Sequence, residues 1–113
     1  MIPLKITYKD IEPSKAISEN IREHFEKIEP LCQDAISCRI VISRPHHHSR
    51  KGMIYHVEIL VSMRGDTLVV NREPEKNAGH EDVYVSIRDA FISLQRLLLE
   101  RNQRVHIRHQ ARA

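Results

Sequence analysis

Apolar residues recur along this chain with two different periods, and the order of these periods limits the fold. Spacings of three and four residues, typical of one buried helix face, occur in residues 17–28 and 83–98. Spacings of two residues, typical of a strand with one buried face, occur before the first helical segment and three times between the two segments. The sequence therefore predicts the element order β-α-β-β-β-α.

Local signals set the ends of these elements. Ser14 is a typical N-cap for the first helix, and Pro30 ends it. The sequence RGD at 64–66 predicts a tight turn between the last two strands, the second of which is TLVVNR at 67–72. The predicted inward-facing residues are Ile2, Leu4, Ile6 and Tyr8; Ile36, Cys38, Ile40 and Ile42; Tyr55, Val57, Ile59, Val61 and Met63; and, on the helices, Ile17, Ile21, Phe25, Ile28, Val83, Ile87, Ala90, Phe91, Leu94 and Leu98.

The connections between these elements predict how they pair. One helix between the first two strands favours parallel pairing of these strands, whereas hairpin connections favour antiparallel pairing of the others. Because each element has one apolar face, both helices are expected on one side of the sheet. The prediction is an α+β fold, a two-layer sandwich of a four-stranded mixed sheet and two helices, in a single domain of residues 1–113. Its predicted core includes Val57, Ile59, Val61, Ile87, Phe91 and Leu94.

Positive charge is concentrated in the second part of the chain. Residues 1–43 contain six Lys or Arg and seven Asp or Glu, whereas residues 44–113 contain twelve and eight. The segments 44–51 and 101–113 contain no acidic residue, so each can present an uncompensated positive field to a polyanion. Apolar runs fall far short of the roughly 18 residues that a membrane helix needs. We therefore expect a cytoplasmic protein without membrane contact.

The segment GHEDVYVSIRDAF (79–91) places an acidic pair directly before the second helix. Asp82 is positioned to cap that helix, and Glu81 favours the positive end of the helix dipole. A catalytic role would need a nucleophile, a base or a second carboxylate, and the sequence indicates no such set. Cys32 and Cys38 lack the CxxC spacing of redox or zinc sites and are expected to be reduced thiols. We therefore expect no enzymatic activity.

Three consecutive histidines, His46, His47 and His48, raise the question of a metal site. Consecutive side chains in an extended loop point in different directions, and zinc ligands are usually separated along the sequence. The alternative is a polar loop whose imidazoles lie near Arg44 and Arg50 and meet phosphates. We favour this second interpretation and expect neither a bound metal nor a cofactor.

The arginines of the predicted second helix form the strongest candidate binding surface. Four of them are separated by three, four and four residues, so a continuous helix would place them in one stripe. These are Arg101, Arg104, Arg108 and Arg112. Arg88 and Arg96 also lie outside the apolar series. The alternative is a solvated helix end, but such ends usually mix both signs of charge, and no acidic residue follows Glu100.

Several segments resemble one known family. The element order, the strand ISCRIVISR (36–44) and above all HEDVYVSIRDAF (80–91) are similar to the ribosome hibernation promoting factor and ribosome-associated inhibitor family, also called sigma-54 modulation proteins. The family pattern at the start of the last helix is matched by Glu81, Asp82, Val83 and Tyr84. The resemblance covers essentially the whole chain and corresponds to a short form without the C-terminal dimerisation domain of the long forms.

The resemblance implies a binding function without chemistry. Family members bind the small ribosomal subunit in the channel for messenger and transfer RNA, and so silence idle ribosomes. Basic residues of the two helices contact ribosomal RNA, and no small-molecule substrate is implied. Lys27, Arg96 and Arg104 match basic positions of the family. The departures are Ser18, Ser93 and Glu100, which stand where well-known members have Arg or Lys.

Arg22, Arg88 and Arg101 are candidates to replace these missing charges. The predicted set of residues that bind ribosomal RNA is therefore Arg22, Lys27, Arg88, Arg96, Arg101, Arg104 and Arg108. The alternative function is a protein-interaction module that regulates a transcription factor or a kinase. In that case the arginines would contact acidic protein surfaces.

Overall fold

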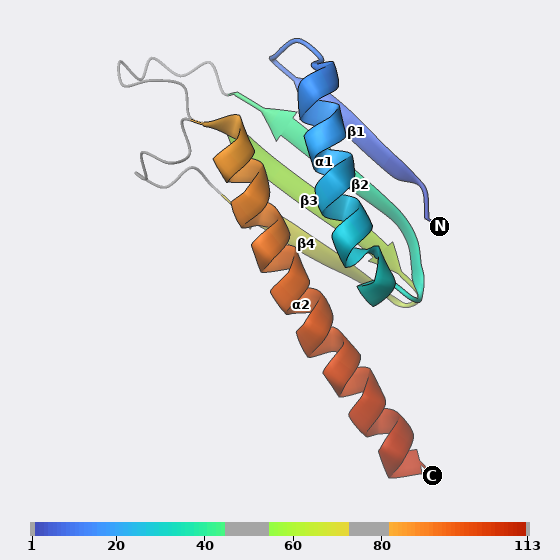
Figure 1. Ribbon diagram of the computed structural model, residues 1–113. Helices are drawn as coiled ribbons and strands as arrows, with labels where there is room; N and C mark the ends of the chain where they lie inside the picture. The colour runs from blue at the N-terminus through green and yellow to red at the C-terminus, as the bar shows by residue number, and fades with distance from the viewer. Residues whose placement is uncertain (1, 45–54, 73–81, 113) are drawn as a thin grey trace.

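Four strands, two α-helices and one short 3-10 helix make up the described part of the chain. The computed structural model describes residues 2–44, 55–72 and 82–112, with the side chains of the last helix described through Arg104. The elements are β1 (Leu4–Lys9), α1 (Lys15–Ile28), η1 (Glu29–Leu31), β2 (Ala35–Ser43), β3 (His56–Met63), β4 (Asp66–Arg72) and α2 (Val83–Arg112) (Figure 1). The predicted element order is therefore confirmed.

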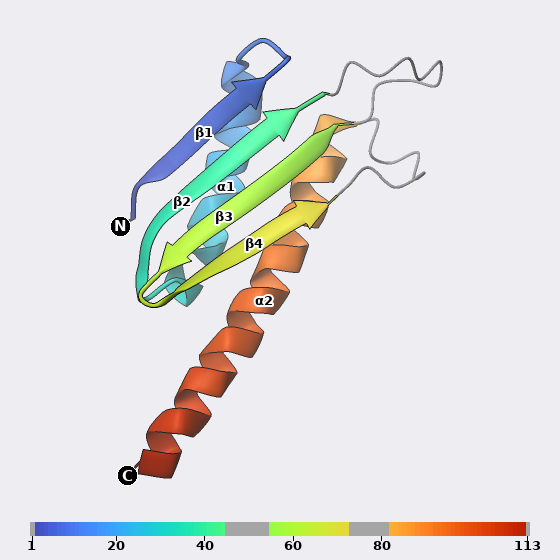
Figure 2. The same ribbon diagram turned by 180° about the vertical axis from the view of Figure 1, so that it is seen from behind.

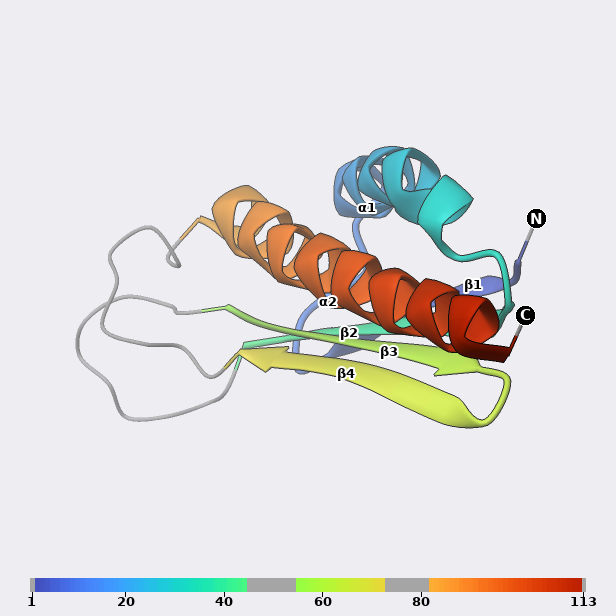
Figure 3. The same cartoon turned by 90° about the horizontal axis from the view of Figure 1, so that it is seen from below.

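The strands form one mixed sheet in the order β1-β2-β3-β4. β1 and β2 are parallel, whereas β2 with β3 and β3 with β4 are antiparallel. Both helices lie on the same face, α1 over the β1 side and α2 over the β4 side (Figure 3). Among the described elements, none covers the opposite face (Figure 2). The predicted two-layer α+β sandwich is confirmed.

Side-chain caps fix the start of both helices. The Ser14 hydroxyl accepts a hydrogen bond from the backbone N–H of Ile17 at 3.3 Å, and α1 ends before Pro30, which lies in η1. At the start of α2, the Asp82 carboxylate accepts the backbone N–H of Tyr84 at 2.9 Å. Each cap satisfies a backbone donor that has no partner within its own helix. The predicted roles of Ser14 and Asp82 are confirmed.

The core lies between the sheet and the helices. All six of the residues proposed for it are buried, namely Val57, Ile59, Val61, Ile87, Phe91 and Leu94. They pack with Ile21, Phe25 and Ile28 of α1 and with Cys38, Ile40 and Ile42 of β2. The two periods of the sequence therefore meet in one apolar cluster, which supports the helices that carry the basic residues.

Ile36 does not share the inward face predicted for it. Its exposed fraction is 60%, whereas Cys38, Ile40 and Ile42 are buried. The pairing of β2 with β3 shifts between Ala35 and Ser37, because Ala35 pairs with Met63 and Ser37 pairs with Ser62. One extra residue at such a bulge breaks the alternation of faces, and this turns Ile36 outward.

The turn between β3 and β4 depends on one glycine. Gly65 has a φ of +79°, in the left-handed region that residues with a Cβ rarely adopt. The hairpin closes directly around it, since Met63 pairs with Asp66. This tight closure holds Asp66 at one end of the sheet.

Candidate nucleic-acid interface

Exposed basic side chains project from both helices. Those predicted from the sequence as binding residues are Arg22 and Lys27 on α1 and Arg88, Arg96 and Arg104 on α2. Successive residues of a helix are about 100° apart around its axis. Arg22 and Lys27 are therefore about 140° apart and lie on different flanks of α1, while each step from Arg88 to Arg96 to Arg104 is about 80°. The cations form a spread across the helical layer rather than a single stripe.

His24 of α1 lies at the junction between the helices. The ring of His24 stacks on Phe91 across this junction, with a centroid distance of 5.3 Å and an interplanar angle of 15°. Burial, then the positive charges of Lys27 and Arg88, lower the pKa of His24 from 6.5, against an opposing effect of Glu23. Helix packing has therefore placed one cation from each helix close enough to affect the same imidazole.

His24 provides a pH-dependent test of this arrangement. We expect its pKa in the folded protein to lie below 6.5. Between that lowered pKa and 6.5 the unfolded chain binds more protons, so stability should rise with pH across this interval and fall as pH decreases through it. An NMR titration should give the midpoint, and His24→Gln should flatten this part of the stability curve. A midpoint at or above 6.5 would contradict the electrostatic grouping.

Arg88 also lies beside an acid of its own helix. Its Nη2 is 3.3 Å from Oδ1 of Asp89, and its side chain remains more than half exposed. Exposed pairs of this kind contribute only about 0–1 kcal/mol, and salt screens them further. Arg88 can therefore reorient toward a phosphate at little cost.

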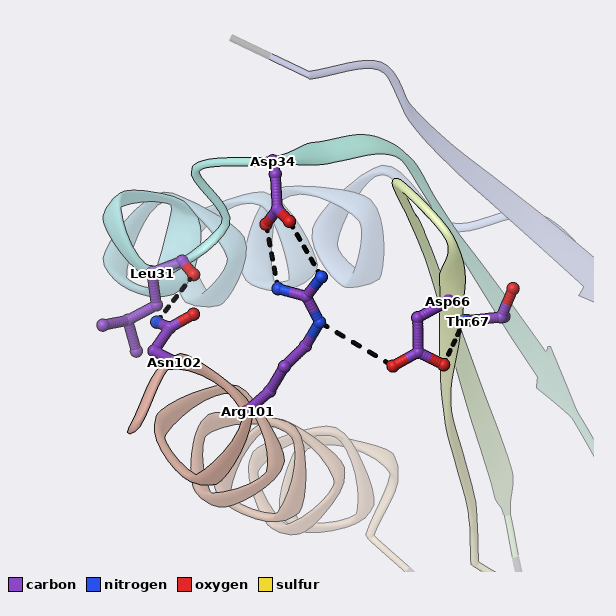
Figure 4. Close-up of polar contacts among 6 residues, drawn as sticks. All are labelled: Leu31, Asp34, Asp66, Thr67, Arg101 and Asn102. Atoms are coloured by element: carbon purple, nitrogen blue, oxygen red, sulfur yellow. Dashed lines mark hydrogen bonds and ion pairs between the residues drawn. The ribbon is translucent and has the colours of Figure 1, made fainter. Parts of the chain in front are cut away.

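Arg101 is turned inward, in contrast to its predicted place on the binding surface. The residue is 7% exposed. Its Nη1 and Nη2 donate to the two carboxylate oxygens of Asp34 at 3.0 and 2.8 Å, and its Nε lies 3.7 Å from Oδ2 of Asp66 (Figure 4). The hydrogen bonds from Arg101 are the main cause that lowers the pKa of Asp34. The guanidinium is thus already engaged with two carboxylates.

The position of Arg101 in the sequence explains its burial. It follows Leu94 and Leu98 at spacings of four and three residues, so it continues the inward face of α2. The predicted stripe with Arg104, Arg108 and Arg112 therefore loses its first member. We leave Arg101 out of the candidate surface, and the side chains of Arg108 and Arg112 lie outside those that the structure describes.

Three residues stand where well-known members of the family have Arg or Lys, and the structure shows the surroundings of each. Ser18 hydrogen-bonds the hydroxyl of Tyr8 at 2.6 Å, which ties α1 to β1. Ser93 is buried, whereas Glu100 is exposed. Of these three positions, Glu100 is the exposed one, and Ser18 is partly buried.

The described residues offer little for catalysis or metal binding. Cys32 and Cys38 are buried, and burial is the main cause that raises their pKa values to about 11 and about 12, so both are protonated at neutral pH. Across residues 2–44, 55–72 and 82–112, no three His, Cys, Asp or Glu side chains gather as they would around a metal ion. The histidine run 46–48 and Glu81 lie outside these ranges.

Comparison with known families shows which protein family the chain belongs to. Residues 4–106 match the family described as Sigma 54 modulation protein / S30EA ribosomal protein. The chain belongs to this family. The match includes all four strands, α1 and most of α2, so the resemblance seen in the sequence is confirmed. Membership in the S30EA family points to a ribosome-associated protein, and the family's description names no enzymatic activity.

Two solved structures share the S30EA fold with this chain. The N-terminal domain of Protein Y from Thermus thermophilus superposes with a TM-score of 0.64 at 21% identity, covering 87% of this chain and 96% of that domain. A ribosomal subunit interface protein from Coxiella burnetii superposes with a TM-score of 0.73 at 16% identity, covering 90% of this chain and 99% of the other. A search of curated protein sequences found no match. No described helix is long and apolar enough to span a membrane.

Proposed function

We propose that this S30EA-family chain inhibits translation by binding ribosomal RNA in the messenger and transfer RNA channel of the small ribosomal subunit. The supporting observation is the set of exposed cations on the helical layer, Lys27, Arg88, Arg96 and Arg104. Lys27 and Arg88, from different helices, both act on His24. Arg22 adds a further positive charge on the other flank of α1. Phosphates are the natural partners of such a spread.

The mechanism is steric occlusion in the cytoplasm, where idle ribosomes are silenced. Lys27, Arg88, Arg96 and Arg104 neutralise phosphates, and the packed sandwich behind them occupies space that messenger and transfer RNA would need. No bond is made or broken in this mechanism. The helices that carry these cations are already ordered, so only the long side chains lose freedom on binding.

Salt dependence provides the primary test. If all four cations neutralise phosphates, the logarithmic plot of binding constant against salt should have a slope of about −2.8 to −3.6. Raising salt from about 50 to 200 mM should then weaken binding about 50- to 150-fold. Co-sedimentation with purified small subunits measures this. Binding that is indifferent to salt would remove the helix cations from the interface.

A second candidate function rests on exposed apolar residues of α2. Ile92 and Leu99 are 57% and 50% exposed, and their spacing of seven residues places them on nearly the same line along the helix. Arg88 and Arg96 lie nearby on the same outer side. Such a mixed surface also fits an acidic protein partner, as a module regulating a transcription factor or kinase would require.

The same assay separates the two candidates. The double variant Ile92→Gln with Leu99→Gln keeps every charge of the helix. If RNA phosphates are the partner, its affinity for small subunits and its salt slope should stay close to those of the unmodified protein. A large loss of affinity with a slope near zero would instead favour the protein-interaction function.

A further inference from the structure

Three separate segments meet where α2 leaves the sheet. Arg101 joins Asp34, which lies just before β2, to Asp66, which is the first residue of β4 after the hairpin turn. The neighbouring Asn102 donates from its side-chain amide to the backbone carbonyl of Leu31 in η1 at 3.1 Å (Figure 4). These polar contacts form a clamp, by which we mean Arg101, Asn102 and their partners.

Beyond the clamp, α2 continues past the end of the sheet (Figures 1 and 2). Residues 102–112 form roughly three more turns and include Arg104. Helices shorter than about 12–15 residues are marginal in water on their own, so these turns depend on the packed part of α2 for their nucleus. The clamp is the last set of side-chain contacts described before them, and it sets where they begin.

The guanidinium suits this role because of its shape. Its planar fork donates from two nitrogens to one carboxylate, and its third nitrogen forms an ion pair with a second carboxylate, which fixes its orientation in two directions. The backbone amide of Arg64 also donates to the carbonyl of Asp34 at 3.3 Å, so the two turns that supply the acids are tied to each other. The fork therefore holds α2 against a preassembled pair of turns.

We infer that Arg101 is a positioning residue, whose ion pairs with Asp34 and Asp66 fix the direction in which the basic end of α2 leaves the sandwich. This inference rests on the proposed function, since direction matters only if Arg104 has to meet a phosphate. The inference also predicts that Asp34, although acidic, favours binding to a polyanion because it holds Arg101 in place. Simple charge counting predicts the opposite effect, and this difference makes the inference testable.

Two clamp variants and one matched control are needed. Asp34→Ala removes an acid and releases Arg101, so charge counting predicts tighter binding to small subunits, whereas loss of positioning predicts about 3- to 10-fold weaker binding. Arg101→Lys keeps the net charge but loses the fork, and it should also weaken binding about 3- to 10-fold. The control Glu100→Gln removes an exposed acid next to Arg101, outside the clamp, and should tighten binding about 2- to 5-fold.

A measurement without RNA completes the experiment. Amide hydrogen exchange of residues 102–112 in the isolated protein should become about tenfold faster in both clamp variants and should not change in Glu100→Gln. Thermal melting shows whether each variant folds. If Asp34→Ala does not fold, Arg101→Lys alone tests the inference. If the unmodified protein fails to bind subunits, the proposed function fails, while hydrogen exchange still decides whether the clamp holds the helix.

The outcomes separate clearly. Weaker binding together with faster exchange in both clamp variants supports the inference. Tighter binding of Asp34→Ala, similar to that of Glu100→Gln, overturns it. Faster exchange with unchanged affinity also overturns it, because the clamp would then order the helix without affecting how the partner is bound.

Discussion

Replacing Arg96 and Arg104 together with glutamate is expected to weaken binding to small subunits by more than about 15- to 30-fold at 0.15 M salt. The two arginines account for two neutralised phosphates, each contributing a slope of about 0.7 to 0.9 against the logarithm of salt, and the two glutamates add repulsion from the RNA. Inhibition of translation in a reconstituted assay should be lost at concentrations where the unmodified protein inhibits fully. Both side chains are exposed, so the melting temperature should change little.

A matched control separates the position of the charges from net charge. Lys5→Glu with Arg39→Glu makes the same change in net charge on the face of the sheet that no described helix covers (Figure 2). Lys5 and Arg39 are exposed and lie opposite each other on β1 and β2. Their reversal should weaken binding only a few-fold, through the long-range field. Equal losses in the two double variants would show that net charge, and not the helical layer, carries the binding.

The fold was predictable because each level of the sequence favours the same arrangement. The periods of the apolar residues, the caps Ser14 and Asp82 and the turn at Gly65 act over a few residues and are therefore visible locally. Ile36 was mispredicted because a bulge depends on how β2 meets β3, and no periodicity within β2 reports that pairing.

The candidate surface was less predictable because it depends on contacts between distant segments. Arg101 and Asp34 are 67 positions apart, so no local pattern shows that one neutralises the other. The sequence did contain one sign that Arg101 is buried, which is its position in the apolar series of α2. An arginine on a buried helix face needs a partner of opposite charge. The placement of Lys27 and Arg88 near the same histidine likewise follows from the packing of the two helices, which composition and spacing do not specify.

Phe91 lies at the contact between the helical layer and the core, and its replacement with alanine should cost about 3–5 kcal/mol of stability. The side chain is 3% exposed and stacks on His24 of α1, so the loss combines apolar burial, a cavity and an aromatic contact. Folded proteins are stable by about 5–15 kcal/mol, and this single change therefore removes a large share. Urea denaturation with an unchanged m value measures it directly.

The neighbouring residue Ile92 provides the control. It lies in the same helix as Phe91 and is also a large apolar residue, but its side chain is more than half exposed. Ile92→Ala should cost less than about 1 kcal/mol, since little burial is lost and alanine favours the helix. A loss below about 1 kcal/mol for Phe91→Ala would show that α1 and α2 do not depend on this contact. The relative positions of Lys27 and Arg88 depend on the same packing of α1 against α2, so a Phe91→Ala variant that remains folded should still bind more weakly to the small subunit than Ile92→Ala.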